Sequence, residues 1–341
     1  MLNRTLPVLI LALLPALAYS GEVKLLTWEA YLSDKVVHAF RLETGHRVEQ
    51  FFISSDSERN AMFDAGGATL FDLVMADNGA TQAYAKQGLI QKMTGVVSSL
   101  AHIDADWQQA CGEFGAAYSW GTLGIAYRQS FGIQIDSWQQ LFVPPAPFQG
   151  KVVTMTDSKE FTAAALMAHS FSPNSSDPRE LQRAFELMRA QRQHVLAYDY
   201  GVSYALSWQK ESEMAMALAY SADVEEIISA TGQKDWTYVV PNEGTLLWVD
   251  CWVIPSGRAV NKATLAFLEF INRPEIAALN AEQAWFPSPI GAARKLTSDA
   301  HKGNTELYPG TEVMKRSVLL YDRPEEAKRR ISAVIDNLKN Q

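Results

Sequence analysis

Strand and helix signals alternate along this chain, which excludes all-α and all-β architectures. Residues 22–28 (EVKLLTW) have strand character, and Ser33 then caps a helix that ends at Gly45. Residues 47–53 and the apolar residues 71–76 (FDLVMA) are typical of further strands, each followed by a helical stretch. This order of elements predicts a mostly parallel sheet with helices on both faces.

A second set of alternating signals begins near residue 150, and a length of 341 residues fits two domains. Two longer apolar runs, residues 118–127 and 245–254, lie where the two sets meet and suit extended crossovers. We therefore expect an α/β protein of two lobes, each a mostly parallel sheet flanked by helices, joined by hinge crossovers. A ligand is expected between the lobes, at the carboxyl ends of the strands. The expected division is residues 21–127 plus 249–296 in lobe 1, and 128–248 plus 297–341 in lobe 2.

The first 20 residues, MLNRTLPVLILALLPALAYS, have the pattern of a secretory signal peptide. Arg4 precedes an apolar run, and small residues follow it, so cleavage after Ala18 or Ser20 satisfies the small-residue rule. A permanent membrane anchor is the alternative, but it needs about 20 unbroken apolar residues, and two prolines interrupt this run. We expect the mature protein to be soluble and outside the cytoplasm.

The sequence has two cysteines, Cys111 and Cys251. Outside the cytoplasm such a pair is a disulfide candidate. Closing the loop between them would stabilise the fold by about 5 kcal/mol in the chain-entropy model. Two separate buried thiols, acting as small apolar residues, are the alternative.

Several motifs of enzymes and nucleotide-binding proteins are missing. The sequence contains no C-x-x-C, no G-x-G-x-x-G, no G-x-x-x-x-G-K-[ST] and no G-x-S-x-G, and its six histidines show no metal-ligand spacing. We therefore expect no cofactor, no metal and no enzymatic activity. A hydrolase that uses two carboxylates is the alternative. The net charge of −8 disfavours nucleic acid as a partner and suits a cationic one.

Acidic and aromatic residues recur where the predicted strands end. Trp248 and Asp250 are two residues apart on a strand, which places them on one face. Asp250 is the one charge in LLWVDCWVIP, so it either meets a basic side chain of this chain or awaits a cation from outside, because burying an unpaired charge is costly. Asp77 poses the same question. The full pattern comprises Trp28, Tyr31, Asp77, Asp157, Glu160, Asp223, Trp248, Asp250 and Phe286.

Simpler explanations exist for several of these residues, but less so for Asp250 inside an apolar strand. Asp157 and Asp223 suit helix N-termini electrostatically, and single aromatic residues are usually core. Together, however, carboxylates and flat rings are what a linear polyamine requires. A carboxylate attracts an ammonium at about 4 Å by about 4 kcal/mol gross at an effective dielectric near ~20. Cation–π attraction to the rings adds ~0.5–2 kcal/mol.

Several segments match a known family in sequence and spacing: TWEAY (27–31), FDLVMADN (71–78), SWGTLGIAY (119–127), TDSKE (156–160), DP (177–178), YSADV (220–224), LWVDCWVIP (247–255), INRPEIA (271–277) and FPSPIGAARKL (286–296). From about Glu22 to its end the chain resembles periplasmic spermidine/putrescine-binding proteins, the soluble receptors of polyamine ABC importers. The resemblance implies a periplasmic-binding-protein fold whose lobes close around the ligand. It also implies a periplasmic location and a membrane partner, with no nucleic acid bound; we expect a monomer.

The resemblance assigns roles to matching positions. It implies that Trp28 and Tyr31 form aromatic walls and that Asp157 and Glu160 hold one end of the ligand. The remaining implied ligand-binding positions are Trp248 and Asp250 at the middle, Phe286 where the family commonly has Tyr, Tyr220 in place of a Trp, Asp223 matching an acid of the putrescine-type branch, and Tyr321 near a position that closes the pocket.

The chain also departs from the family. Asp77 and Gly79 stand where many members have Ser and an aromatic residue, and Ala30 replaces an acid, with Glu29 beside it. An extra carboxylate and a lost ring should change which amine fits. The resemblance therefore leaves the ligand open within the spermidine, norspermidine and putrescine class.

A closer similarity is to the norspermidine-sensor subgroup, receptors of the same fold that report to a membrane-bound cyclic di-GMP enzyme. Residues 109–127 (QACGEFGAAYSWGTLGIAY) and the pair Asp250-Cys251 carry this similarity. Both cysteines have counterparts in the subgroup, which favours the disulfide. Two outputs remain open, an ABC importer and a signalling enzyme.

Overall fold

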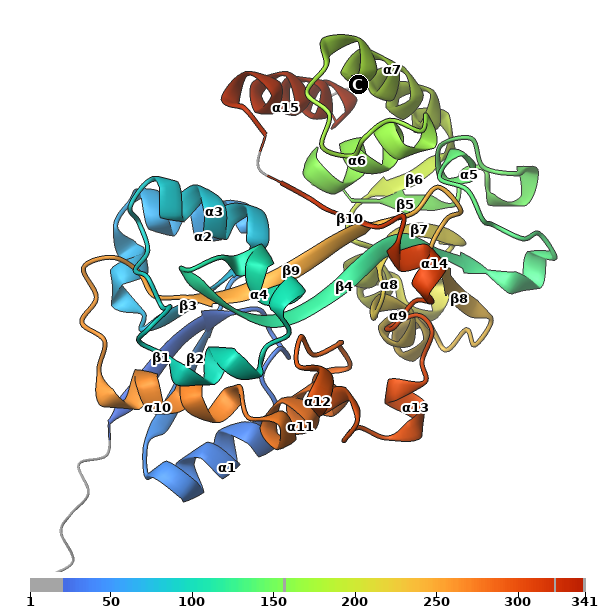
Figure 1. Ribbon diagram of the computed structural model, residues 1–341. Coiled ribbons are helices and arrows are strands. Elements are labelled where there is room, and N and C mark those ends of the chain that lie inside the picture. Colours follow the sequence, from blue (N-terminus) through green and yellow to red (C-terminus); the bar gives the residue numbers. More distant parts are fainter. Residues whose placement is uncertain (1–20, 156–157, 322, 340–341) are drawn as a thin grey trace, which may run out of the picture.

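The computed structural model describes residues 21–155, 158–321 and 323–339. The predicted signal peptide and Asp157 lie outside the described residues. In Figure 1 the helices form two groups, and two long strands run from one group to the other. We call the group that contains the N-terminal strands the first half and the other group the second half.

The first half begins with three parallel strands, each followed by a helix. Ser33 caps the first helix as expected, because its hydroxyl accepts from the Val36 N–H at 3.3 Å, and Gly45 ends that helix in the left-handed conformation with φ 73°. The elements are β1 (Glu22–Thr27), α1 (Asp34–Thr44), β2 (Arg47–Phe52), α2 (Asp56–Asp64), β3 (Leu73–Asp77), α3 (Asn78–Lys86) and α4 (Ala105–Cys111).

The long strands are β4 (Gly115–Arg128) and β9 (Leu246–Val253), which pair antiparallel from Gly115↔Val253 to Thr122↔Leu247. β9 also pairs antiparallel with β3, while the far end of β4 pairs with strands of the second half. The two apolar runs predicted as crossovers are therefore the strands that connect the halves.

The second half is built on a short parallel sheet, in which β5 lies between two parallel neighbours. Its strands are β5 (Val152–Thr154), β6 (Val195–Tyr198), β7 (Met216–Tyr220) and β8 (Trp236–Val239). Its helices are α5 (Gln139–Phe142), α6 (Ser158–Ala168), α7 (Pro178–Gln191), α8 (Gly201–Trp208) and α9 (Asp223–Thr231). The whole sheet has the order β2-β1-β3-β9-β4-β7-β5-β6, with β10 beside β9 and β8 beside β4.

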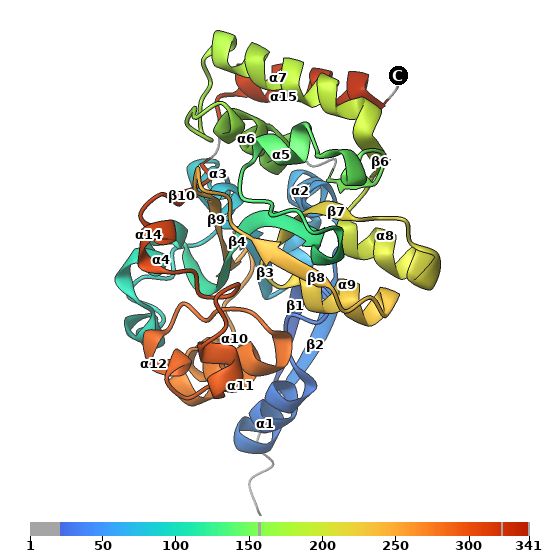
Figure 2. The same ribbon diagram turned by 90° about the vertical axis from the view of Figure 1, so that its right-hand side faces the viewer.

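The C-terminal part of the chain returns to both halves. Helices α10 and α11 pack on the first half, whereas α15 packs against α6 and α7, and Figure 2 shows α7 and α15 side by side. These elements are α10 (Lys262–Ile271), α11 (Pro274–Ala284), α12 (Gly291–Arg294), α13 (Asp299–Lys302), α14 (Thr311–Met314), β10 (Val318–Leu319) and α15 (Glu325–Lys339). Among the described residues, no helix combines the length and apolarity needed to cross a membrane.

The hydrophobic interior follows the same division. One core surrounds β1, β3 and β9 in the first half, and separate clusters fill the second half. Leu307 and Tyr308 lie in the first core, whereas Ile331 of α15 lies in the second half. The lobe boundaries predicted from the sequence stay a prediction.

The predicted disulfide is present in the structure. Cys111, at the end of α4, is bonded to Cys251 of β9, with 5.9 Å between their Cα atoms. It ties α4 to the strand that carries Asp250, one residue away.

Candidate ligand-binding site

Two carboxylates lie side by side where β3 meets β9. Asp77 at the end of β3 is directly opposite Asp250 in the antiparallel register, and directly opposite residues project from the same face of a sheet. Two ionised carboxylates in this arrangement repel each other, so each needs a cation, a hydrogen-bond donor or a proton.

Asp77 is paired with cations of this chain. Its Oδ2 lies 3.0 Å from Arg59 Nη2 and 3.5 Å from Lys159 Nζ, and its Oδ1 accepts from the Ala80 N–H at 2.9 Å as the cap of α3. Burial alone would raise the pKa of Asp77, but the charges of Lys159 and Arg59 hold that pKa well below its usual range. For Asp77, the question raised by the sequence is answered by a partner within the protein.

Asp250 is different. Its residue is 6% exposed, and within the described residues it forms no salt bridge. Burial raises the pKa of Asp250 to about 7, and the charge of Asp77 acts in the same direction. A hydrogen bond from the Tyr31 hydroxyl and the charge of Arg59 oppose the rise. Asp250 is therefore a buried carboxylate whose negative charge is not matched by a cation bound to it.

A second buried carboxylate faces this group from the second half. Asp223, in the first turn of α9, is also 6% exposed and accepts hydrogen bonds from the Tyr200 hydroxyl at 2.5 Å and the Tyr220 N–H at 2.7 Å. Burial raises the pKa of Asp223 to about 7 despite these two donors, and the charge of Glu226 adds to the rise.

Tyr31 interacts with both carboxylates. Burial raises the pKa of Tyr31, and the charges of Asp250 and Asp223 raise it further. Since Tyr31 interacts with both acids, carboxylates from the two halves converge on one region. Its backbone is also fixed, because its carbonyl accepts from the Tyr118 hydroxyl at 2.7 Å and from Asn280 Nδ2 at 3.1 Å.

Aromatic rings line the same region. The Tyr220 and Trp248 ring centroids are 6.0 Å apart at 79°, and Tyr31 and Phe286 are 5.6 Å apart. The Trp248 indole lies so close to β4 that a Cβ at Gly121 would be 2.3 Å from its Cζ2. Glycine at position 121 therefore lets the ring lie against the neighbouring strand.

The remaining predicted site residues are less closely tied to this group. Trp28 follows β1 and packs as a half-buried residue on the first core, and Glu160 is half-buried in the first turn of α6. Tyr321 is 48% exposed, and its backbone N–H donates to Asn174 Oδ1. Asp157 lies outside the described residues. The assignment of these four residues to a ligand site stays a prediction.

Several residues that build this region were not predicted: Arg59, Tyr118, Lys159, Tyr200 and Asn280. They act through contacts between elements far apart in sequence, such as Tyr200 at the start of α8 with Asp223. Lys159 was visible in the TDSKE segment beside Glu160, but its partners were not. Among residues 21–155, 158–321 and 323–339, no three His, Cys, Asp or Glu side chains are placed to hold a metal ion.

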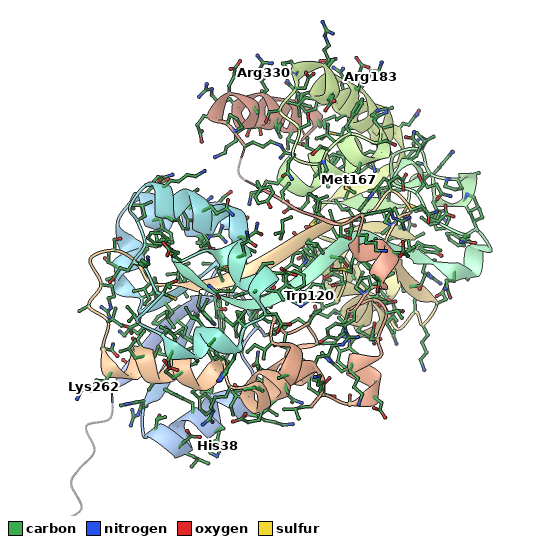
Figure 3. All side chains as sticks on the ribbon, in the orientation of Figure 1. His38, Trp120, Met167, Arg183, Lys262 and Arg330 are labelled. Atoms are coloured by element: carbon green, nitrogen blue, oxygen red, sulfur yellow. A yellow bond between two sulfur atoms is a disulfide. The ribbon has the colours of Figure 1, made fainter. Side chains whose placement is uncertain are left out.

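Figure 3 shows how the labelled side chains are distributed over the molecule. In Figure 3, Arg183 and Arg330 lie at the outer end of the second half, and His38 and Lys262 at the opposite end of the molecule. Trp120 on β4 lies between these ends (Figure 3). Asp250 is paired with Ser119, the residue before Trp120, so it lies where β4 and β9 join the halves.

Comparison with known proteins identifies relatives over most of the chain. A model of the family described as bacterial extracellular solute-binding protein matches residues 35–303. The norspermidine sensor of Vibrio cholerae serotype O1 is 31% identical over 309 residues, covering 90% of this chain and 86% of the sensor. The putrescine-binding periplasmic protein SpuD of Pseudomonas aeruginosa is 28% identical over 334 residues, covering 92% of this chain and 90% of SpuD.

Solved structures share the fold. A putative spermidine/putrescine ABC transporter from Listeria monocytogenes has a TM-score of 0.82 at 22% identity, covering 94% of this chain and 99% of that one. PotD from Streptococcus pneumoniae has a TM-score of 0.81 at 21% identity, with the same coverage. At this identity the likeness establishes the architecture, and it confirms the predicted two-lobed α/β fold class.

Proposed function

This chain belongs to the family of bacterial extracellular solute-binding proteins, and from that premise we propose that it is a periplasmic receptor for a linear polyamine of the spermidine, norspermidine or putrescine class. The observation that carries the proposal is Asp250, a buried carboxylate that forms no salt bridge with any residue that the structure describes. Relatives described as a norspermidine sensor and as spermidine/putrescine- or putrescine-binding proteins support the choice of ligand.

The ligand would be held from both halves. One ammonium pairs with Asp250 beside Tyr31, and another pairs with Asp223 beside Tyr200. The methylenes between them pack on aromatic rings such as that of Trp248. Because both carboxylates are 6% exposed, a ligand reaches them only when the halves move apart, and closure then removes water from the ammonium groups.

The direct test is calorimetric titration of the mature protein with 1,3-diaminopropane, putrescine, norspermidine and spermidine. We expect saturable 1:1 binding to at least one amine, weakened by salt less steeply than for a surface patch, since buried pairs are poorly screened. An uncharged diol of the same length serves as control. Absence of binding to all four amines refutes the proposed ligand class.

We also propose that the receptor acts without turning over its ligand. Its relatives are described as binding proteins or as a sensor. In the proposed complex Asp250 and Asp223 both pair with ammonium groups of the ligand. Prolonged incubation with each amine followed by product analysis should return the amine unchanged. Any product favours the carboxylate-dependent hydrolase instead.

The loaded receptor would dock on a membrane protein as a monomer. Two partners fit, a polyamine ABC permease or a transmembrane cyclic di-GMP enzyme, and similarity to the norspermidine sensor favours the second. Deleting the gene would lower uptake of labelled polyamine in the first case. In the second case, uptake is unchanged and the cellular cyclic di-GMP level responds to polyamine only when the gene is present.

The predicted signal peptide is tested separately. Mass measurement of the exported protein tests cleavage after Ala18 or Ser20.

A further inference from the structure

One lysine crosses between the two halves at the edge of the proposed site. Lys159 is in the first turn of α6, in the second half, yet its Nζ lies 2.7 Å from Asp56 Oδ2 and 3.5 Å from Asp77 Oδ2. Both of these acids belong to the first half, where Arg59 also contacts them, at 2.8 and 3.0 Å. The Arg59 side chain is 1% exposed and that of Lys159 is 38% exposed, so Lys159 is the more accessible of the two cations.

The charges in this cluster do not cancel. Three carboxylates, those of Asp56, Asp77 and Asp250, share the cations of Arg59 and Lys159. Asp250 responds to the other members of the cluster, because the charges of Asp77 and Asp56 both raise its pKa while that of Arg59 lowers it. With all three acids ionised, the described side chains of Asp56, Asp77, Asp250, Arg59 and Lys159 together carry one net negative charge, which is matched by the charge of a single ammonium.

A lysine side chain ends in a primary ammonium on a chain of methylenes, the same chemistry as the end of a polyamine. Because it is tethered to α6, its effective concentration at Asp56 and Asp77 is in the millimolar range or above. A free amine must displace it to use those carboxylates. The tethered ammonium therefore competes with any ligand group that would extend past Asp250.

We propose that Lys159 is a specificity-determining residue that fills, with its own ammonium, a place that one further ammonium of the ligand would otherwise take. It thereby limits how many ammonium groups the site binds. This inference rests on the proposed polyamine function. It concerns the count of ammonium groups, whereas the distance between Asp250 and Asp223 sets their spacing.

The test compares amines that differ by one aminopropyl unit: 1,3-diaminopropane, norspermidine and norspermine. In Lys159→Gln the charge is lost and the cluster has room for one more ammonium. In the wild type, affinity should stop rising at one of the two lengthening steps of this series. For the two amines on either side of that step, we expect Lys159→Gln to raise the affinity ratio of the longer to the shorter amine about tenfold or more. Lys159→Arg keeps the charge and should keep the wild-type ratio.

Two further variants make the test decisive. Lys92→Gln removes the same charge from an exposed pair with Glu113 and should leave the ratio unchanged. Asp56→Asn removes one carboxylate, so the affinity ratio of the longer to the shorter amine should fall. If thermal denaturation shows that Lys159→Gln is unfolded, the Asp56→Asn ratio tests the inference in its place.

An unchanged ratio in Lys159→Gln, or an equal shift in Lys92→Gln, overturns the inference while leaving the polyamine receptor intact. If the wild type binds none of the three amines, nor any other polyamine, the proposed function fails and this inference fails with it.

Discussion

Replacing Asp250 by Asn separates a binding carboxylate from a structural one, because the two roles predict opposite effects on the ligand-free protein. The amide keeps the shape of the side chain and still accepts a hydrogen bond from Tyr31. It removes a negative charge that lies opposite Asp77 and is 6% exposed. If Asp250 binds an ammonium of the ligand, Asp250→Asn relieves its repulsion with Asp77 in the ligand-free protein and weakens amine binding.

The magnitude follows from the burial. A rise in the pKa of Asp250 from 3.8 to about 7 means that ionising it inside the empty protein costs about 4 kcal/mol more than in water. A bound ammonium recovers part of that free energy, and removing one partner of a buried charged pair typically costs about 2–5 kcal/mol. We expect Asp250→Asn to weaken amine binding by about 2–4 kcal/mol, roughly 30-fold to 1,000-fold in Kd.

Calorimetry gives Kd, and thermal denaturation without ligand gives stability. We expect an unchanged or higher Tm for Asp250→Asn together with the loss of affinity. The matched control is Asp299→Asn, which makes the same charge change at a side chain that is 94% exposed and paired with Lys302. An affinity within about threefold of wild type removes Asp250 from the site, since ~0.6 kcal/mol is too little for a desolvated pair. A large loss of Tm shows instead that Asp250 serves the fold.

Three other outcomes follow from the geometry. Because burial raises the folded-state pKa of Asp250 above 3.8, its ionisation destabilises the ligand-free protein increasingly as pH rises from about 4 to about 7, so acidification from pH 8 to 6 should raise the free energy of unfolding. Amine binding should weaken over the same pH change, because the ammonium needs the ionised carboxylate. Binding near pH 6.5 should therefore release protons, which calorimetry detects as a buffer-dependent enthalpy that is smaller in Asp250→Asn. Gly121→Ala would place a methyl group 2.3 Å from the Trp248 indole and should displace the ring, costing about 1–3 kcal/mol of affinity by calorimetry, and unaltered Trp fluorescence and affinity would contradict this packing. Reducing the Cys111–Cys251 disulfide should lower the free energy of unfolding by about 2–5 kcal/mol in urea titrations, whereas equal midpoints with and without reductant would show that the bond contributes nothing.

The sequence predicted those parts of the molecule that depend on local periodicity. The crossover strands were visible as apolar runs, and the spacing of Trp248 and Asp250 placed both on one face of β9. The anomaly of a single charge within that strand also identified Asp250 as an acid in need of a partner. These features are encoded within about ten residues of one another, so they can be recognised without knowing the fold.

What the sequence did not show depends on contacts across the molecule. The sequence raised the same question for Asp77 as for Asp250, namely which cation pairs with the acid, yet Asp77 is paired with Arg59 from the neighbouring helix and with Lys159 from the other half. Asp223 was predicted, but Tyr200, which donates to it, directly precedes α8, a helix that was not predicted. Asp77 and Asp250 thus have different electrostatic states, because contacts between distant elements give Asp77 two cationic partners and give Asp250 no salt bridge among the described residues.

The burial of two carboxylates in the ligand-free protein costs free energy that a bound cation can recover. Asp250 and Asp223 both have pKa values raised to about 7, mainly by burial, so bringing the halves together without a cation forces these carboxylates either to take up protons or to stay ionised at a cost. In the proposed binding mode a polyamine would remove that cost at both acids at once, and a monoamine would remove it at one. Closure should therefore respond to the number of ammonium groups that reach both acids, and less to total hydrophobic contact. In small-angle scattering at pH 8, a diamine long enough to span Asp250 and Asp223 should compact the protein where a monoamine of the same carbon count does not, and equal compaction by both would show that ring packing, not charge, drives the closure.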